Sequence, residues 1–154
     1  MDTLFSDEYF MKEALKEAQK AFDKAEVPIG AVVVAENRII ARAHNLTEQL
    51  NDVTAHAEMQ AFTAAADTLG SKYLHDCTLY VTVEPCVMCC GASYWAQISK
   101  IVYATKEPKR SPETIHNIIL HPKTKLIGGI MAKEASILMK SFFASKRGQL
   151  VLFS

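Results

Sequence analysis

The sequence predicts an α/β fold in which a mixed β-sheet is covered by helices. Helical and strand-like hydrophobic patterns alternate along most of the chain, which is the order that such folds require. The chain has 154 residues, 49% of them hydrophobic, which is enough for one core and too little for two. We therefore expect residues 1–154 to form a single domain, without repeats or low-complexity segments.

The first half of the chain predicts a helix, a hairpin and a second helix. Apolar residues recur at helical spacing after Ser6, with acidic residues in the first turn. Short apolar runs at residues 27–34 and 38–43 predict a β-hairpin, and the polar residues 44–52 predict a loop. The second helix is predicted from an apolar stripe that stops before Gly70: Ala55, Met59, Phe62, Ala66 and Leu69.

The second half predicts more strands and helices in alternation. Pro85 suits the first turn of a helix that continues to about residue 97. Residues 105–121 have no clean period and contain prolines, which predicts an irregular connection. Strands are predicted at residues 77–83, 100–104 and 125–127. The last helix is predicted from Met131, Ala135, Leu138, Met139 and Phe142.

Charge is distributed unevenly along the chain. The formal net charge is zero, but residues 1–99 hold 7 Lys and Arg against 14 Asp and Glu, whereas residues 100–154 hold 10 against 3. Two interpretations are open. The basic third is either a set of solvated helix faces and loops, or an electrostatic surface for a polyanion such as nucleic acid.

Cysteine usage and the N-terminal residues predict a cytoplasmic protein. The first ten residues lack a basic segment followed by an apolar run, so they do not resemble a signal peptide, and no stretch approaches the roughly 18 apolar residues of a membrane span. Without a secretion signal, the four cysteines are expected to be thiols or metal ligands and not disulfides.

Two short motifs, about thirty residues apart, carry the chemistry. One is H-x-E at His56 to Glu58, and the other is P-C-x-x-C at Pro85 to Cys89. Each motif alone is weak evidence. Two of four cysteines can fall at this spacing by chance, and a lone histidine often serves only as a hydrogen-bonding residue at a helix start. Together, each at the start of a predicted helix, they indicate a metal site.

The spacing of these residues predicts a zinc ion with one open coordination position. Cys86 and Cys89 lie three apart at a helix start, so they project from one face, and a helix N-terminus favours thiolates. With His56 they supply three of the four ligands of a tetrahedral Zn²⁺ and leave the fourth position to water. Cys77 and Cys90 are expected to be buried core thiols.

The open position and the nearby carboxylate predict a hydrolytic deaminase of nucleobases. Zinc lowers the pKa of water toward neutrality. Glu58, two residues after His56, is expected to stay off the metal, to take a proton from that water and to pass it to a ring nitrogen. The alternative is a noncatalytic zinc site that only holds two helix starts together.

On these motifs the sequence resembles the bacterial tRNA adenosine deaminase family, within the cytidine deaminase-like superfamily. The resemblance runs from about the first helix to Arg147. It rests on segments that are specific to the superfamily: residues 27–32 (VPIGAV), 44–45 (HN), 54–58 (TAHAE), 79–89 (LYVTVEPCVMC) and 121–122 (HP).

The resemblance implies a three-layer αβα cytidine deaminase-like fold, a homodimer, one Zn²⁺ per chain, and conversion of adenosine to inosine at the wobble position in the anticodon arm of tRNA. It further implies that Asn45 and the backbone of Ala57 contact the target nucleoside. The residues that it places near tRNA are Phe142, Phe143, Lys146 and Arg147.

Several of these roles have alternatives. Asn45 is also a suitable turn residue, one of the adjacent Phe142 and Phe143 is expected to pack in the core, and Trp95 is expected in the core or in a dimer interface. Residues 106–112 depart from the family, which usually has a glycine-rich stretch here, because they are charged and contain prolines. Deamination of guanine, cytosine or a small nucleoside therefore remains the alternative function.

Overall fold

The computed structural model describes residues 4–107 and 111–153, with the backbone alone for residues 147–153. Its described strands form one sheet in the order β2-β1-β3-β4-β5. The strands are β1 (Gly30–Ala35), β2 (Arg38–His44), β3 (Cys77–Val83), β4 (Lys100–Thr105) and β5 (Lys125–Ile127). The helices are α1 (Asp7–Asp23), α2 (Ala57–Leu69), α3 (Val87–Ala96), the 3₁₀ turn η1 (Glu113–Ile115), α4 (His116–Ile119) and α5 (Ala132–Phe153).

The sheet is mixed, as the sequence predicts. Strand β1 runs antiparallel to both β2 and β3, whereas β3, β4 and β5 run parallel to one another. Parallel neighbours need a crossover, and helix α3 supplies the crossover from β3 to β4. The prediction of an α/β fold with a mixed sheet is confirmed.

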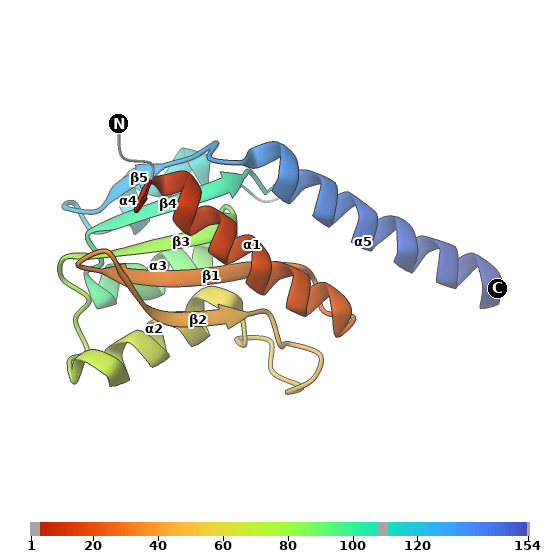
Figure 1. Ribbon diagram of the computed structural model, residues 1–154, viewed down its shortest axis with the longest axis horizontal. Helices are drawn as coiled ribbons and strands as arrows, with labels where there is room; N and C mark the ends of the chain where they lie inside the picture. The colour runs from red at the N-terminus through yellow and green to blue at the C-terminus, as the bar shows by residue number, and fades with distance from the viewer. Residues whose placement is uncertain (1–3, 108–110, 154) are drawn as a thin grey trace.

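Helices cover both faces of the sheet, so the fold has three layers (Figure 1). Alternate residues of each central strand point to opposite faces. In β1, Val33 packs with α2, whereas Val32 packs with α1. Helices α2, α3 and α4 cover one face, and α1 and the first part of α5 cover the other. Figure 1 shows that α5 continues beyond the sheet, away from the rest of the molecule.

Helix α1 lies so close to the sheet that only glycine fits beneath it. A Cβ atom on Gly30 would overlap the backbone oxygen of Ala14 and the backbone nitrogen of Ala18. The amide of Gly30 donates to the hydroxyl of Thr82 on β3 at 3.1 Å. The small residue therefore fixes the position of α1 against the start of β1.

The hairpin of β1 and β2 is joined by a tight two-residue turn. Glu36 and Asn37 both have positive φ angles, 50° and 61°. Two consecutive left-handed residues make the turn whose twist suits a hairpin. The sequence prediction of a hairpin is confirmed, although its first strand begins at Gly30 and not at residue 27.

The connection after β4 is more ordered than the sequence predicts. Residues 105–121 contain the end of β4, the turn η1 and the short helix α4, where we expected an irregular connection. These helices have three and four residues, which is too short for a hydrophobic period to show. Helix α5 also continues well past Phe142, the last residue of the predicted stripe.

One edge of the sheet collects four chain segments. Because β1 is antiparallel to its two neighbours, its first residue lies beside the last residues of β2 and β3, and β4 ends at the same edge. The register pairs Gly30 with His44, and Val83 with Thr105. The segments that meet there are residues 26–29, 45–56, 84–86 and, after β4, the described residues 106–107 and 111–116. Across the part of the chain that the structure describes, no helix has the length and apolar character to cross a membrane.

Candidate zinc and nucleobase site

Two helices begin at this edge, and each begins with a candidate metal ligand. His56 is the N-cap residue of α2 and Cys86 is the N-cap residue of α3, both with extended backbone angles. Neither side chain caps its own helix, so both are available to a ligand. Cys89 lies in the first turn of α3, on the same face as Cys86.

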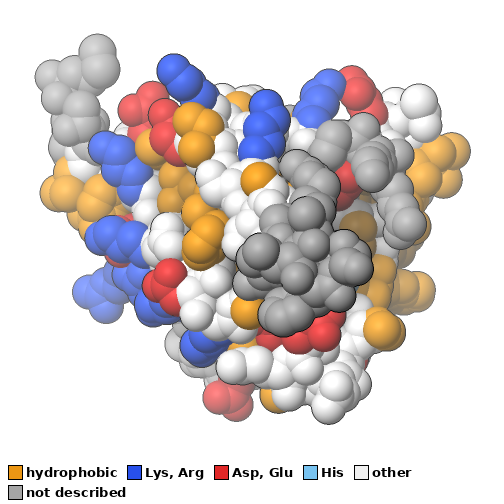
Figure 2. All heavy atoms as spheres, turned by 90° about the vertical axis from the view of Figure 1, so that its right-hand side faces the viewer, with side chains coloured by type: hydrophobic (Ala, Val, Ile, Leu, Met, Phe, Trp, Pro, Cys, Tyr) orange, Lys and Arg blue, Asp and Glu red, His pale blue; other side chains and the backbone are white. Residues whose placement is uncertain are grey.

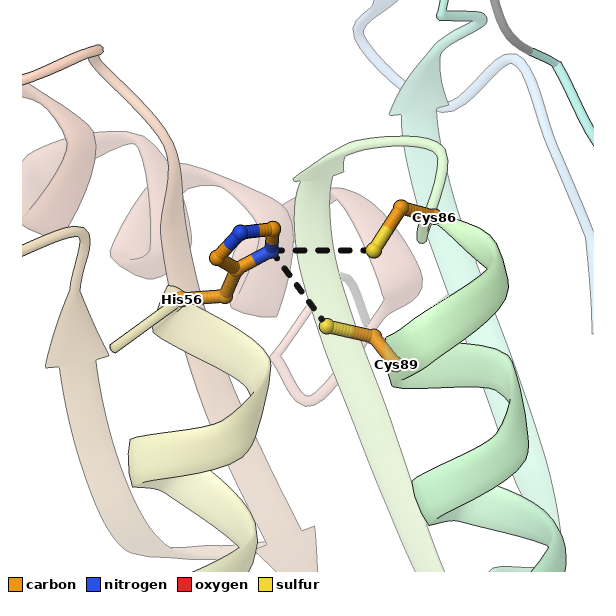
Figure 3. A group of neighbouring side chains, drawn as sticks. All are labelled: His56, Cys86 and Cys89. Atoms are coloured by element: carbon orange, nitrogen blue, oxygen red, sulfur yellow. Dashed lines mark hydrogen bonds between the residues drawn. The ribbon is translucent and has the colours of Figure 1, made fainter. Parts of the chain in front are cut away.

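The three side chains converge on one point (Figure 3). The Nδ1 atom of His56 is 3.6 Å from the sulfur of Cys86 and 3.6 Å from the sulfur of Cys89. Zinc–nitrogen and zinc–sulfur bonds of about 2.0 and 2.3 Å at a tetrahedral angle place such ligand atoms about 3.5 Å apart, close to these distances. The arrangement therefore fits a tetrahedral zinc ion with three protein ligands.

The electrostatics of the two thiols also fit a cation. A hydrogen bond from the Cys89 thiol lowers the pKa of Cys86 to about 4, and the same contact raises the pKa of Cys89. The pair thus carries one negative charge readily, whereas a second thiolate needs a cation beside it. A divalent metal with thiolate ligands meets this need.

Glu58 lies beside the metal ligands and is almost completely buried, with 3% of its surface exposed. Burial raises its pKa to about 7, where a carboxyl group both accepts and releases protons near neutral pH. Its Oε1 atom has no hydrogen-bond partner among the described residues. A buried polar atom without a partner is unfavourable unless a ligand or solvent meets it.

A pocket of about 190 Å³ opens next to His56 and Glu58. Its remaining walls come from the segment before β1 and the segment after β2. Asn45 is 5% exposed, and its amide nitrogen lies 3.4 Å from the hydroxyl of Thr47. The residues that line the pocket are Val27, Ile29, Asn45, Thr47, His56, Ala57 and Glu58.

The pocket wall at residues 45–55 is held by contacts that the sequence analysis missed. The side-chain amide of Gln60 on α2 donates to the backbone oxygens of His44 at 2.8 Å and Ala55 at 3.1 Å, so it ties both ends of the loop. The buried carboxylate of Glu26 accepts hydrogen bonds from two amides in the middle of the loop. Because one partner in each of these hydrogen bonds is a backbone group, no sequence pattern reveals the contacts.

A second buried carboxylate holds the opposite segment. Glu84, directly before Pro85, accepts from the amide of Glu107 at 3.1 Å and from the hydroxyl of Ser111 at 2.9 Å. The Nε2 atom of His116 on α4 lies 3.3 Å away from the same carboxylate. The charged connection after β4 is therefore fastened to the residues that lead into α3.

The structure brings together the predicted residues of the chemical centre, and the described residues among those predicted to bind nucleic acid do not line this pocket. Asn45, Ala57 and Glu58 line one pocket with His56, and Cys86 and Cys89 lie against His56. The predicted core thiols Cys77 and Cys90 are each 1% exposed, which confirms their burial.

The residues expected near tRNA lie elsewhere, on α5. Phe142 is buried and Phe143 is exposed, which confirms that one of the pair packs in the core. Lys146 is exposed, and its Nζ lies 5.5 Å from the centre of the Phe142 ring. The side chain of Arg147 lies outside the described residues. Trp95, expected in the core or in an interface, is 77% exposed, so it does not belong to the core of this chain.

Comparison with known proteins agrees with this site. Residues 5–105 match the family described as the cytidine and deoxycytidylate deaminase zinc-binding region. The tRNA-specific adenosine deaminase of Aquifex aeolicus is 42% identical over 148 residues, which cover 94% of this chain and 98% of the relative.

Solved structures show the same fold. A tRNA:A34 deaminase, studied for A-to-I editing at the wobble position of transfer RNA, is 39% identical, with a TM-score of 0.79 over 84% of this chain and 98% of its own. Guanine deaminase from Bacillus subtilis is 40% identical, with a TM-score of 0.62 over 69% of this chain and 66% of its own.

Proposed function

Because the chain belongs to the zinc-binding cytidine and deoxycytidylate deaminase family, we propose that it converts adenosine to inosine at the wobble position of tRNA. The chain is a zinc-dependent hydrolytic enzyme of this family. One observation carries the proposal most directly: an almost fully buried glutamate lies between a three-ligand zinc site and a pocket with an amide side chain. The proposal takes residues 1–154 as one deaminase domain.

The residues of the site have distinct roles in the proposed reaction. His56, Cys86 and Cys89 would hold the zinc ion, which would supply an activated water when bound. Glu58 takes a proton from water, whose hydroxide adds to the amino-bearing carbon, and passes this proton to the ring nitrogen. It then carries the proton of the new hydroxyl group to the amino group, and the carbon–nitrogen bond breaks to release ammonia. Asn45 and the backbone of Ala57, at the free N-terminal end of α2, orient the base. A noncatalytic zinc site would have no use for Glu58, which is why we do not favour that alternative.

The choice of tRNA as substrate rests on two observations. The relative and the solved structure that align along most of the chain carry tRNA deaminase names. Basic side chains are also exposed on the second part of the chain. Figure 2 shows Lys and Arg of the whole chain along the upper and left margins of the side toward which α5 runs. The described exposed lysines of this part are Lys106, Lys123, Lys125, Lys133, Lys140 and Lys146.

A second candidate function is deamination of guanine. It is favoured by the 40% identity to the guanine deaminase of Bacillus subtilis, which aligns with 69% of this chain. The sequence of residues 106–112 also lacks the glycines that we expected of a tRNA deaminase. Both candidates use the same zinc site and the same Glu58.

The deciding experiment offers zinc-loaded protein four substrates: bulk tRNA, adenosine, guanine and cytosine. We expect inosine and ammonia from tRNA, and no product from adenosine, guanine or cytosine. Release of ammonia from guanine without inosine in tRNA would overturn the tRNA assignment and leave the zinc chemistry intact.

Salt gives an independent check on the tRNA assignment. Binding to a polyanion releases counterions, so the affinity falls steeply as salt rises. We expect the rate at low tRNA concentration to drop at least tenfold between 50 and 200 mM salt, in line with the steep salt dependence of several phosphate contacts. A rate that does not respond to salt would count against tRNA.

The proposal includes a cytoplasmic location, where tRNA is found, and a homodimer. Large apolar side chains are exposed on α3 and α4, which contact each other: Val87 and Trp95 on α3, and Ile118 on α4. Such exposed apolar groups are typical of subunit interfaces. A solution mass equal to one chain would contradict the homodimer.

A further inference from the structure

We infer that Glu26 is a positioning residue for the nucleobase pocket: its buried carboxylate holds the loop that carries Asn45 and Thr47. The inference rests on the proposed function, because it assumes that the pocket beside His56 receives the base. Glu26 itself does not line this pocket. It acts only through the residues that do.

The carboxylate of Glu26 binds two consecutive amides of the loop. Its two oxygens accept hydrogen bonds from the amide of Glu48 at 3.0 Å and from the amide of Gln49 at 2.8 Å. These amides begin a single turn, in which the amide of Leu50 donates to the oxygen of Leu46. An anion at the start of such a turn satisfies donors that the turn leaves unpaired.

The position of the carboxylate is itself fixed. The backbone amide of Glu26 donates to the oxygen of Ala21 at the end of α1. The next residue, Val27, lines the pocket, and the oxygen of Ile29 accepts from the amide of Asn45 at 3.0 Å. One short segment thus forms one wall of the pocket and anchors the opposite wall.

Burying the carboxylate of Glu26 costs free energy, and the packing of the loop alone gives no reason for this cost. Glu26 is 0% exposed, and it makes no ion pair with any residue that the structure describes. A buried charge compensated only by amides is unfavourable unless its geometry is well satisfied. Glutamine has nearly the same shape, but its NH₂ group would face an amide donor, so it cannot replace both bonds.

The test compares Glu26→Gln with Glu48→Gln. The control removes the same charge from an exposed side chain of the same loop and leaves the backbone amides in place. We expect both variants to keep one zinc per chain. In Glu26→Gln we expect amide hydrogen exchange of residues 46–50 to accelerate at least tenfold, and kcat/KM per zinc-loaded site to fall at least tenfold, mainly through KM.

A double-mutant cycle separates positioning from a general loss of stability. If Glu26 acts through Asn45, then Glu26→Gln adds less than about threefold to the loss in kcat/KM that Asn45→Ala causes alone. A full additional tenfold loss in that background would overturn the inference. Unchanged exchange in residues 46–50 of Glu26→Gln would overturn it as well.

Two provisions keep the outcome decisive. If Glu26→Gln does not fold, Glu26→Asp keeps the buried charge and loses the reach to the two amides, and the same exchange and kinetic changes are expected from it. Hydrogen exchange is measured without turnover, and kinetics use whichever substrate the unaltered protein accepts. A chain active on guanine and not on tRNA would therefore refute the proposed substrate and still test Glu26.

Discussion

The two sides of the site are built in different ways. On the metal side, His56, Cys86 and Cys89 sit at the first turns of two helices that pack on the sheet, so regular structure aims them at one point. On the proposed substrate side, Asn45 and Thr47 lie on a loop. The loop is held by the carboxylate of Glu26, which accepts hydrogen bonds from its amides, and by the side chain of Gln60, which donates to its backbone oxygens. The candidate metal ligands are thus positioned by helix starts, whereas the residues proposed to bind the base are positioned by side chains that bind the backbone of their loop.

This difference predicts which property, reaction or binding, a substitution on each side should change. Changes on the metal side should alter the reaction for every substrate, because the same ligands and proton carrier serve all of them. Changes on the loop side should alter binding while zinc stays in place. Two substitutions on the metal side and one in the segment after β4 test this division, in order of decreasing effect.

The largest effect is expected from Cys89→Ala. We expect zinc content near zero and a loss of deamination of more than a thousandfold, because two remaining ligands hold the ion poorly. The matched control is Cys90→Ala, which removes an equally buried thiol that donates to the backbone oxygen of Pro85 and does not belong to the group of metal ligands. Its zinc content, measured by atomic absorption, should stay at one per chain, with a stability loss of about 1 kcal/mol. If both variants lost zinc, the distinction between Cys89 as a metal ligand and Cys90 as a core thiol would be wrong.

Glu58→Gln should act on turnover alone. Because the side chain keeps its size and does not hold the metal, we expect full zinc content and a decrease in kcat of about 10² to 10⁴-fold. The matched control, Asp67→Asn, removes an exposed acid from the other end of the same helix and should leave kcat unchanged. Undiminished ammonia release by folded, zinc-loaded Glu58→Gln would show that another group carries the proton.

The smallest effect is expected from Ser111→Ala. It removes one hydrogen bond to the carboxylate of Glu84, and this contact fastens only the segment after β4. We expect a change of at most about threefold in KM, no change in zinc content, and a stability loss of about 1 kcal/mol in a denaturant titration. A collapse of kcat would instead tie this segment to the metal side.

The sequence predicts the metal side far better than the substrate side, for a physical reason. His56, Glu58, Cys86 and Cys89 stand at short fixed spacings next to helix-start signals, so their mutual position follows from local geometry. Glu26 and Gln60 bind backbone groups between 5 and 23 residues away. Because every residue has a backbone oxygen and nearly every residue has an amide, the sequence does not indicate which of these groups a side chain binds. The role of Glu26 is recognised only in the structure, where its carboxylate is buried without a charged partner.

The same distinction explains the errors in the predicted elements. The helices α1 and α2 have several turns, and their apolar stripes were recognised. The elements η1 and α4 are shorter than two turns, so they show no stripe and were predicted as an irregular connection. Trp95 illustrates another limit, because a large apolar side chain in a helix predicts burial without saying whether the chain itself or a partner provides it.

The carboxylate of Glu84 has a consequence for transplanting loops between deaminases. It stands one residue before Pro85 and two before Cys86, while its oxygens grip Glu107 and Ser111 across the site. If another segment replaced residues 106–116, Glu84 would stay buried and would lose its hydrogen-bond partners in that segment. Exchanges meant to retarget this enzyme therefore have to carry the hydroxyl at position 111 and the imidazole at position 116, or replace Glu84 at the same time.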